Sequence, residues 1–349
     1  MLKWVPNKNI DNELVNKLFK KSIESNHFTN NGPNVHLLES FIRNKFNIEN
    51  DKSVILVTNG AVGLHSITSG MQYTENKTIK WATQSFTFPP SAQSNLSSVE
   101  IIDIDRDGGI DLELINDDIN GIIITNIFGN VVDIDKYTEW AKKNNKYIVF
   151  DNAATAHTFY KGKNCVNYGN GCVISFHHTK PFGFGEGGAI IVDKKYETAI
   201  RCLNNFGIGL TDKYWVKEGN NNKMSDISAV YILQFLMNNF DKIVSHHNDL
   251  YNYVKEKMVK YDDKITTWKL FPSFHGNGVI VPSCLCLLFN NYKDHIRIKI
   301  LENNIYCRKY YYPLKNTKVA CEIFDSILCI SFTTETTKKD IDNIFKLVE

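Results

Sequence analysis

The stretch SFHHTKPFGFGEGGAIIVD, residues 175–193, decides which kind of α/β fold the chain can adopt. Gly183, Gly185 and Gly188 match G-x-G-x-x-G, the spacing of a dinucleotide-binding loop. Such a loop leads from a strand into a helix, because the helix N-terminus binds the pyrophosphate. Here the glycines lead into AIIVD, whose branched apolar residues are typical of a strand. The sequence therefore favours a glycine-rich turn between two strands over a dinucleotide-binding site.

The histidines and the lysine of the same stretch allow two further interpretations. His177 and His178 are adjacent, so they point to opposite faces of an extended segment, and no HExxH motif accompanies them. We therefore predict no metal site. Lys180 follows an apolar strand and precedes the glycines, which let backbone pack closely around it. A lysine buried in this way loses its proton readily and attacks carbonyl carbons, although a lone lysine is more often a solvated surface residue.

The flanking sequence alternates strand patterns with helical patterns. Predicted strands span residues 53–60, 78–85, 99–105, 121–129, 146–152, 172–178 and 188–193, and predicted helices span 61–71, 89–97 and 133–145. Val- and Ile-rich strands that alternate with helices predict a mostly parallel sheet with helices on both faces. Long helices follow over 220–258, and then strands at 278–289 and 326–332 with helices at 295–304 and 338–349. We expect a large domain, residues 1–240, and a smaller α+β domain, residues 241–349.

Length and composition limit the possible classes of protein. The chain has 349 residues, of which 43% are hydrophobic, and this is enough for sizeable cores. A formal net charge of +2 without a basic block argues against a nucleic-acid partner. No apolar run is long enough for a signal peptide or a membrane span. The eight scattered cysteines fit reduced thiols, so we expect a cytoplasmic protein.

Three positions near the predicted strand ends would complete a site around Lys180. Asp151 ends one strand, where its carboxylate could keep a pyridine nitrogen protonated, or could serve only as a turn residue. Gly60 begins a helix whose free N–H groups could bind a phosphate, or forms an ordinary turn. Phe88 could stack on an aromatic ring or pack in the core. Together these are the parts that pyridoxal phosphate chemistry requires.

At this point the sequence resembles the sugar-nucleotide aminotransferases of the DegT/StrS type over nearly its whole length. Besides residues 175–193, the matching blocks are WATQSFTFPPSA (81–92), VFDNAATAHTFYKGK (149–163) and GNNNKMSDISA (219–229). The resemblance implies fold type I of the pyridoxal-phosphate-dependent transferases, which is the aspartate aminotransferase architecture. That fold has a mostly parallel central sheet with helices on both faces and a smaller C-terminal α+β domain.

The resemblance also implies roles for individual residues. Lys180 would carry the cofactor covalently and move protons, and Asp151 would face the pyridine nitrogen. Ser175 would bind the cofactor phosphate together with the backbone N–H groups of the turn at Gly60, Ala61 and Val62. Phe88 would stack on the ring. Asn221 would reach the phosphate of the neighbouring subunit's cofactor, which implies a homodimer with shared active sites.

The chain departs from the family pattern at three positions. Ala61 replaces the usual threonine, so a hydroxyl contact to the phosphate is lost. Ala154 stands where a glutamine normally lies against the cofactor ring, and Asn152 or Thr155 is a candidate substitute. Asn126 stands where many relatives have histidine.

The reaction implied by the resemblance is transamination, because a related dehydratase branch has histidine in place of Lys180. L-Glutamate would donate its amino group to the 4-keto carbon of a UDP- or dTDP-linked 4-keto-6-deoxyhexose, giving a 4-amino-4,6-dideoxy sugar nucleotide. Within the family, the sequence most resembles the 4-aminotransferases that form nucleotide-linked 4-amino-4,6-dideoxyglucose (viosamine). Alternatives are a 3-aminotransferase, a dehydratase and a regulator without turnover. Candidate substrate residues are Thr29, Asn30, Lys223, Arg308 and Tyr310, the last within the run Tyr310-Tyr311-Tyr312.

Overall fold

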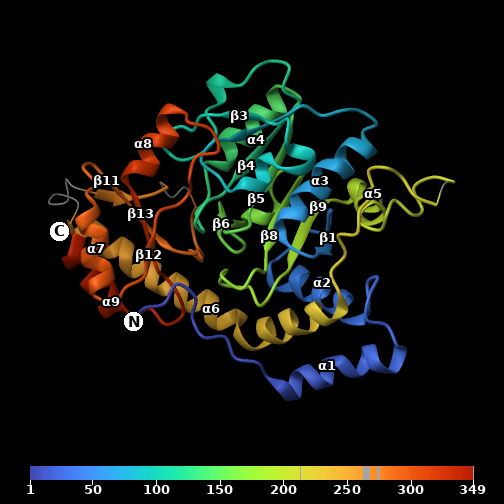
Figure 1. Ribbon diagram of the computed structural model, residues 1–349, viewed down its shortest axis with the longest axis horizontal. Helices are drawn as coiled ribbons and strands as arrows, with labels where there is room; N and C mark the ends of the chain where they lie inside the picture. Colours follow the sequence, from blue (N-terminus) through green and yellow to red (C-terminus); the bar gives the residue numbers. More distant parts are fainter. Residues whose placement is uncertain (213, 262–267, 273–275, 349) are drawn as a thin grey trace.

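The computed structural model describes residues 1–212, 214–261, 268–272 and 276–348, and a seven-stranded sheet forms its centre (Figure 1). The strands lie in the order β1 (Lys52–Val57), β9 (Gly188–Asp193), β8 (Gly171–Ser175), β5 (Tyr147–Asp151), β4 (Gly121–Thr125), β2 (Trp81–Gln84) and β3 (Glu100–Ile102). Within this sheet only β9 runs antiparallel to its neighbours, so the predicted mostly parallel sheet is confirmed. The glycine-rich stretch turns from β8 back into β9 and not into a helix.

Alternate residues of the central strands face two layers of helices. In β1, Val54 and Leu56 pack on one side of the sheet, whereas Ile55 and Val57 pack on the other. The first layer comprises α2 (Pro33–Lys45), α4 (Ile134–Lys143) and the beginning of α6 (Asp226–Tyr261), and the second comprises α3 (Gly60–Thr74) and α5 (Glu197–Leu203). α1 (Asn12–Ser25) packs outside α2 and α6. Burial of both faces is the reason why these strands are apolar throughout.

A second sheet is antiparallel and packs against loops that follow strands of the first sheet at their carboxyl ends. It contains β10 (Trp268–Leu270), β11 (Leu285–Phe289), β13 (Ile327–Ile330) and β12 (Cys307–Arg308), in that order. One face is covered by α7 (Asp294–Glu302) and α9 (Lys338–Val348), and the other by α8 (Lys318–Ser326). On the α8 side, Cys286 and Cys329 share an apolar cluster with Phe86 and Phe128 of the larger sheet's loops. The two sheets are therefore joined by packed side chains.

α6 is one continuous helix of 36 residues that contacts both cores. Its early turns lie against the central sheet, and Leu250 and Val254 pack into the core of the second sheet. The domain boundary expected at residue 240 falls inside this helix, and the division of the chain into domains stays a prediction. No helix in the described ranges is both long enough and apolar enough to span a membrane.

Two predicted elements differ from the structure. Residues 89–97 form two short 3₁₀ helices and not one α-helix, because Ser94 has a φ of 55°, which an α-helix does not allow. The strand expected from residue 278 begins only at Leu285, after Pro282. The short elements are β6 (Phe159–Tyr160), β7 (Lys163–Asn164), η1 (Pro89–Ala92), η2 (Ser94–Leu96), η3 (Leu112–Leu114), η4 (Cys165–Asn167) and η5 (Lys194–Tyr196).

A buried carboxylate, that of Asp226, ties the N-terminal helices to α6. It accepts hydrogen bonds from the backbone N–H groups of Asn34 (2.8 Å) and Val35 (2.9 Å), which belong to the first turn of α2. The Asn34 amide (2.8 Å) and the Ser22 hydroxyl of α1 also donate to it. A side chain at Gly32 would lie 2.6 Å from this carboxylate, so the approach requires glycine. Asp226 thus acts as the N-terminal cap that α2 lacks in its own sequence.

Replacing Asp226 by Asn tests this anchor. The amide of Asn would turn an N–H group toward the N–H donors of α2, so we expect the free energy of unfolding to fall by about 2–4 kcal/mol. Urea denaturation at neutral pH measures the change. The matched control is Asp241→Asn, which removes only the exposed ion pair with Lys45 and should leave the midpoint nearly unchanged. Equal midpoints for the two variants would contradict the role of Asp226.

Candidate active site

A cavity of about 510 Å³ opens where the carboxyl ends of β4, β5 and β8 meet the second sheet. This is the edge at which parallel α/β sheets form their sites. Its walls combine the loop after β1, the loop after β2, the ends of β4, β5 and β8, and the segment around β12. Eight of the residues predicted from sequence line it: Gly60, Ala61, Phe88, Asp151, Ser175, Lys180, Arg308 and Tyr310.

One end of the cavity is the N-terminus of α3. The N-cap residue Asn59 accepts a hydrogen bond from the N–H of Val62 at 3.0 Å. The N–H groups of Gly60 and Ala61 belong to the first turn, so they have no acceptor within the helix and line the cavity. Ser175, at the end of β8, lies beside Gly60, since a side-chain carbon added at Gly60 would come within 3.2 Å of the Ser175 Cβ. This arrangement suits a phosphate group.

Gly188 allows close packing of backbone beside the N-terminus of α3. A Cβ atom at Gly188 would lie 2.6 Å from the carbonyl carbon of Asn59 and 2.7 Å from the nitrogen of Gly60. Only glycine therefore lets the turn after β1 lie directly against the start of β9. The last glycine of the apparent dinucleotide motif therefore serves close packing of backbone beside the N-terminus of α3.

Asp151 and Lys180 supply the titratable groups of the cavity. Asp151 is buried and Lys180 is half-buried, and the Asp151 carboxylate accepts a hydrogen bond from the N–H of Ala153 at 3.0 Å. Burial raises the pKa of Asp151, and the nearby Lys180 opposes this shift. Burial lowers the pKa of Lys180, and Asp151 opposes that shift in turn. Each group therefore stabilises the charged form of the other. Lys180 still gives up its proton more readily than a surface lysine, because its pKa is lowered.

The loop that carries Lys180 is tightly wound. The N–H of Lys180 donates to the His177 carbonyl at 2.8 Å, and the N–H of Gly183 donates to the Lys180 carbonyl at 3.0 Å. The His177 ring lies 2.8 Å from the Thr179 hydroxyl and 3.4 Å from Glu186. The two histidines are thus neighbours of the lysine. Among the described residues, neither histidine belongs to a group of three potential metal ligands.

Aromatic side chains form the wall nearest the second sheet. Phe88 is 56% exposed on the cavity surface, and its ring lies 6.2 Å from that of Tyr311. Tyr311 stacks on Phe128 with a centroid distance of 5.1 Å. These rings provide an apolar wall against which an aromatic group could pack.

Arg308 is a second cationic residue that lines the cavity, and aromatic rings surround its guanidinium. Its guanidinium donates to the hydroxyls of Tyr310 (2.6 Å) and Tyr306 (3.4 Å) and lies 5.1 Å from the centre of the Trp4 ring. The stacking leaves a planar cation on the cavity surface, which is suited to a carboxylate or phosphate.

The other predicted residues lie outside the cavity of this protomer. Val62 packs against the core on the α3 side of the sheet, and its N–H donates to Asn59. Thr29 and Asn30 lie between α1 and α2. Lys223 bridges to the end of β1, and its ammonium donates to the side chain of Asn221 at 2.7 Å.

The two candidate substitutes for the missing glutamine do not reach the cavity either. Ala154 lines the cavity. The amide oxygen of Asn152 accepts from Asn126 at 2.7 Å, and its buried amide nitrogen has no hydrogen-bond partner. The hydroxyl of Thr155 donates to the Asn126 carbonyl at 2.6 Å. Asn126 thus forms hydrogen bonds with the side chains of both Asn152 and Thr155. Neither side chain fills the space beside Ala154, which is part of the cavity.

Several cavity residues gave no signal in the sequence. Trp4 comes from the N-terminus, and Ser283 and Cys284 come from the segment before β11. The Cys284 sulfur lies 3.4 Å from that of Cys286, which lies 3.4 Å from that of Cys329. Burial raises the pKa of the Cys284 thiol, but hydrogen bonds from these cysteines and the charge of Lys180 outweigh burial and lower it. All eight cysteines are free. Tyr311, which also lines the cavity, belongs to the aromatic run that the sequence had already offered as a candidate.

The set of donors fits pyridoxal phosphate. The helix N-terminus and Ser175 suit its phosphate, and the buried carboxylate of Asp151 suits a protonated pyridine nitrogen. Lys180 suits its aldehyde carbon, and Phe88 lies on the same cavity surface. The cofactor predicted from the sequence therefore agrees with the chemistry of the residues that the structure brings together.

Known proteins provide an independent comparison. The chain is 25% identical over 358 residues to dTDP-4-amino-4,6-dideoxy-D-glucose transaminase of Shigella dysenteriae, covering 93% of this chain and 92% of that protein. It is 31% identical over 161 residues to UDP-4-amino-4,6-dideoxy-N-acetyl-beta-L-altrosamine transaminase of Campylobacter jejuni, and this match spans only 43% of that relative's length.

Solved structures share the fold. A putative PLP-dependent aminotransferase from Bacillus cereus has a TM-score of 0.83 at 21% identity and covers 99% of this chain and 98% of its own. DesI, solved in the presence of its TDP-sugar product, has a TM-score of 0.81 at 18% identity and covers 97% of this chain and 90% of its own. Both support fold type I. A model of the DegT/DnrJ/EryC1/StrS aminotransferases matches residues 9–349, and the chain therefore belongs to this aminotransferase family.

Proposed function

We propose that this protein is a pyridoxal-phosphate-dependent aminotransferase acting on a sugar nucleotide. It transfers the amino group of L-glutamate to carbon 4 of a UDP- or dTDP-linked 4-keto-6-deoxyhexose, releasing 2-oxoglutarate and a 4-amino-4,6-dideoxy sugar nucleotide. The observation that carries the proposal is the pair formed by the half-buried Lys180 and the buried Asp151 in one cavity with a helix N-terminus. The names of the Shigella and Campylobacter relatives support carbon 4 and the deoxysugar.

The chain's own residues would hold the cofactor and move the protons. When bound, pyridoxal phosphate supplies an electron sink and a carrier for the amino group. The N–H groups of Gly60 and Ala61 and the Ser175 hydroxyl hold its phosphate. Asp151 keeps a positive charge at the pyridine nitrogen, and Phe88 covers the ring.

Lys180 acts as general base and general acid. Its Nζ takes the proton from the α carbon of the amino donor and, in the second half of the reaction, delivers a proton to carbon 4 of the sugar. Burial favours the neutral amine that the first step needs, since it lowers the pKa of Lys180. The two half-reactions share one site, so ping-pong kinetics follow.

Arg308 and Tyr310 are the substrate residues that we propose within the protomer. Arg308 would bind an anionic group, either the carboxylate of L-glutamate or the diphosphate of the sugar nucleotide. Thr29, Asn30, Asn221 and Lys223 would contribute from a neighbouring subunit, since they lie outside this protomer's cavity.

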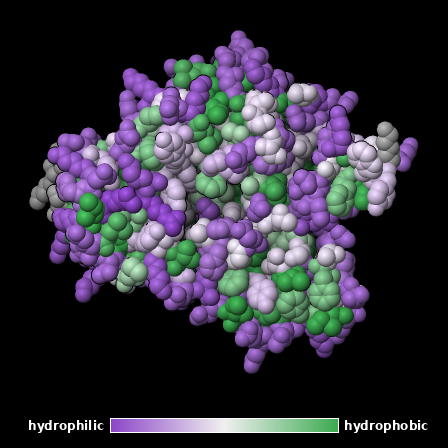
Figure 2. Space-filling model, in the orientation of Figure 1, coloured by the Kyte–Doolittle hydropathy of each residue, from purple (hydrophilic) through white to green (hydrophobic). Residues whose placement is uncertain are grey.

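The surface supports a homodimer, which we propose as the working form in the cytoplasm. The loop before Asn221 exposes Phe206, Tyr214 and Trp215. Figure 2 shows further hydrophobic surface gathered over α1, where Ile23 is 64% exposed. A second copy would cover such exposed apolar groups and bring Asn221 toward the partner's cavity. Free cysteines fit a reducing compartment.

Replacing Lys180 by Ala tests the central role of the lysine. We expect kcat to fall by about 10³-fold or more, because both covalent attachment and proton transfer are lost. The visible absorption band of the bound cofactor should also disappear, and borohydride should no longer fix the cofactor to the chain. Lys194→Ala, at an exposed lysine, is the control. A glutamate-dependent turnover in Lys180→Ala close to that of wild type would refute the assignment.

Asp151→Asn separates charge from shape. The amide fills the same space but cannot hold a positive charge at the pyridine nitrogen, so we expect kcat to fall by about 10²-fold while the cofactor stays bound. Stopped-flow absorbance after addition of L-glutamate measures the first half-reaction. Asp117→Asn, at an exposed aspartate, should behave as wild type. Unchanged rates in Asp151→Asn would exclude the proposed function of this carboxylate.

The position of amination is tested on the product. The purified protein is incubated with pyridoxal phosphate, L-glutamate and either a 4-keto or a 3-keto 6-deoxyhexose nucleotide, with UDP and dTDP compared. We expect amine only from the 4-keto substrates, seen as new amino-sugar signals by mass spectrometry and NMR. Amination of the 3-keto substrate alone, or loss of water without amination, would support the 3-aminotransferase or dehydratase alternative.

A further inference from the structure

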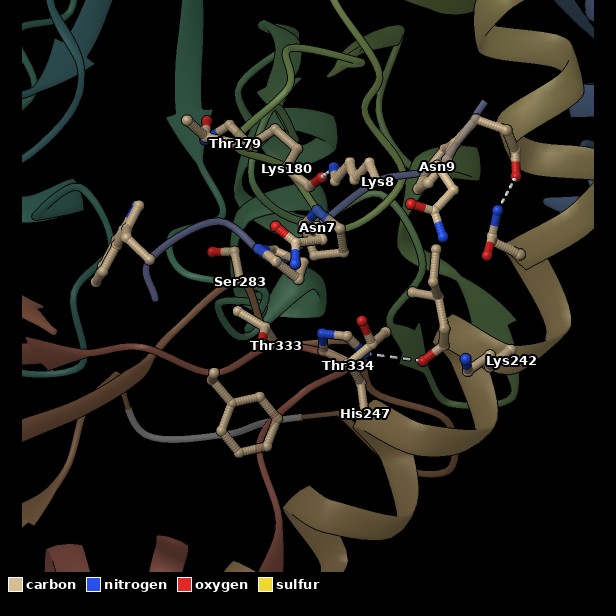
Figure 3. A pocket seen from close by; sticks show the side chains of 17 residues that line it. Asn7, Lys8, Asn9, Thr179, Lys180, Lys242, His247, Ser283, Thr333 and Thr334 are labelled. Atoms are coloured by element: carbon tan, nitrogen blue, oxygen red, sulfur yellow. Dashed lines mark hydrogen bonds between the residues drawn. The ribbon is translucent and has the colours of Figure 1, made fainter. Parts of the chain in front are cut away.

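The N-terminal segment places the ammonium of Lys8 against the backbone of the loop that carries Lys180. Its Nζ donates hydrogen bonds to the carbonyl oxygens of His178 (2.8 Å), Lys180 (2.8 Å) and Gly183 (2.5 Å). Figure 3 shows Lys8 reaching the backbone of Lys180 from a segment far away in the sequence. An ammonium has three donors, so all of them are used on this one loop.

The loop needs a cation at this point. The carbonyl groups of His178, Lys180 and Gly183 converge on one atom, so their dipoles would repel one another without a positive charge between them. The loop is also closely packed at this point, because a side chain at Gly183 would lie 1.9 Å from the His177 carbonyl oxygen. Lys8 therefore fixes the backbone on both sides of the Lys180 Cα.

The charge of Lys8 is balanced by these carbonyl groups. No carboxylate forms an ion pair with Lys8 in the part of the chain that the structure describes. Facing it are the ring of Phe235 on α6, 5.0 Å away, and the histidines His178 and His247. Lys242 of α6 lines the same small pocket. Burial lowers the pKa of Lys8 to about 7, whereas its carbonyl partners favour the charged form.

Both ends of the N-terminal segment are fixed. Leu2 pairs with Ile305 beside the second sheet. At the other end, Asp11 accepts from Asn238 of α6 at 3.0 Å, and its backbone N–H donates to Gln234 at 3.1 Å. Lys8 lies between these two anchored positions, so the fixed segment holds its ammonium in place against the loop. This geometry distinguishes Lys8 from a surface lysine that only happens to lie near the loop.

We propose that Lys8 is a positioning residue, which holds the Lys180 loop in place and so keeps the Lys180 amine at the reacting carbon. The inference rests on the proposed function, in which Lys180 moves the protons. Displacement of a catalytic group by about 1 Å can cost about 10²-fold in rate, so a lost anchor beneath the loop should be visible in kcat.

The experiment compares Lys8→Met, Lys8→Arg and the control Lys3→Met in the full-length, cofactor-loaded protein. Lys3 lies in the same segment, and its ammonium contacts only the exposed side chain of Asn7. We expect kcat of Lys8→Met to fall by about 10- to 100-fold with KM for the sugar nucleotide nearly unchanged. Lys8→Arg should recover part of the rate because it keeps the charge, and Lys3→Met should equal wild type.

Two further measurements do not depend on turnover. In Lys8→Met, amide hydrogen exchange of residues 176–187 should become faster, with and without pyridoxal phosphate. The midpoint pH of the visible absorption change of the bound cofactor should also shift from its wild-type value. If Lys8→Met does not fold, Lys8→Gln, which keeps two N–H donors, takes its place.

The outcomes separate the two proposals. Wild-type exchange rates, midpoint and kcat in Lys8→Met would overturn the positioning role. Failure of the wild-type protein to aminate any sugar nucleotide would instead refute the proposed function, and exchange and absorption would still decide the role of Lys8. A variant that only loses stability, with wild-type kcat and midpoint for the folded protein, would also overturn the proposal.

Discussion

The mutual electrostatic compensation of Asp151 and Lys180 is the constraint on which the site depends. A buried carboxylate costs several kcal/mol unless a partner of opposite charge lies close by, and the half-buried Lys180 is that partner for Asp151. Here Asp151 ends β5, and Lys180 lies in the loop after the neighbouring strand β8. Parallel pairing of these two strands brings the groups to the same edge, so the sheet topology satisfies the electrostatic requirement. Removal of Lys180 would leave the buried Asp151 carboxylate without its opposite charge, so the two groups depend on each other.

Local patterns allowed the sequence to predict the central sheet and the residues at its strand ends. Val- and Ile-rich runs identified β1, β4, β5, β8 and β9, and polar residues directly after them identified Asp151 and Lys180. These properties are encoded within a few residues of chain, so they can be read without knowledge of the fold. The failures also have local causes: the positive φ of Ser94 divides the helix expected over residues 89–97, and the strand expected from residue 278 begins only after Pro282.

Contacts between distant segments could not be predicted in this way. Trp4 and Lys8 precede the loop that they approach by more than a hundred residues, and Cys329 meets Cys286 only because β11 and β13 pair. The same holds for Asn126, whose contacts with Asn152 and Thr155 exclude both from replacing the missing glutamine at Ala154. Side chains with suitable chemistry were present in the sequence, but their partners were decided by tertiary packing.

The antiparallel strand β9 has a consequence for the phosphate-binding end. Gly188 is paired with Val57 on one side and with Ser175 on the other. One residue of β9 thus sets the alignment of two strands that come from separate parts of the chain and that lead into the two parts of the phosphate site that we propose. A shift by one residue between β8 and β9 would turn Ser175 to the opposite face of the sheet. The register of β9 with its two neighbours therefore sets the position of Ser175 beside the turn after β1. Insertions in the hairpin loop between β8 and β9 are compatible with phosphate binding only if they leave this register intact.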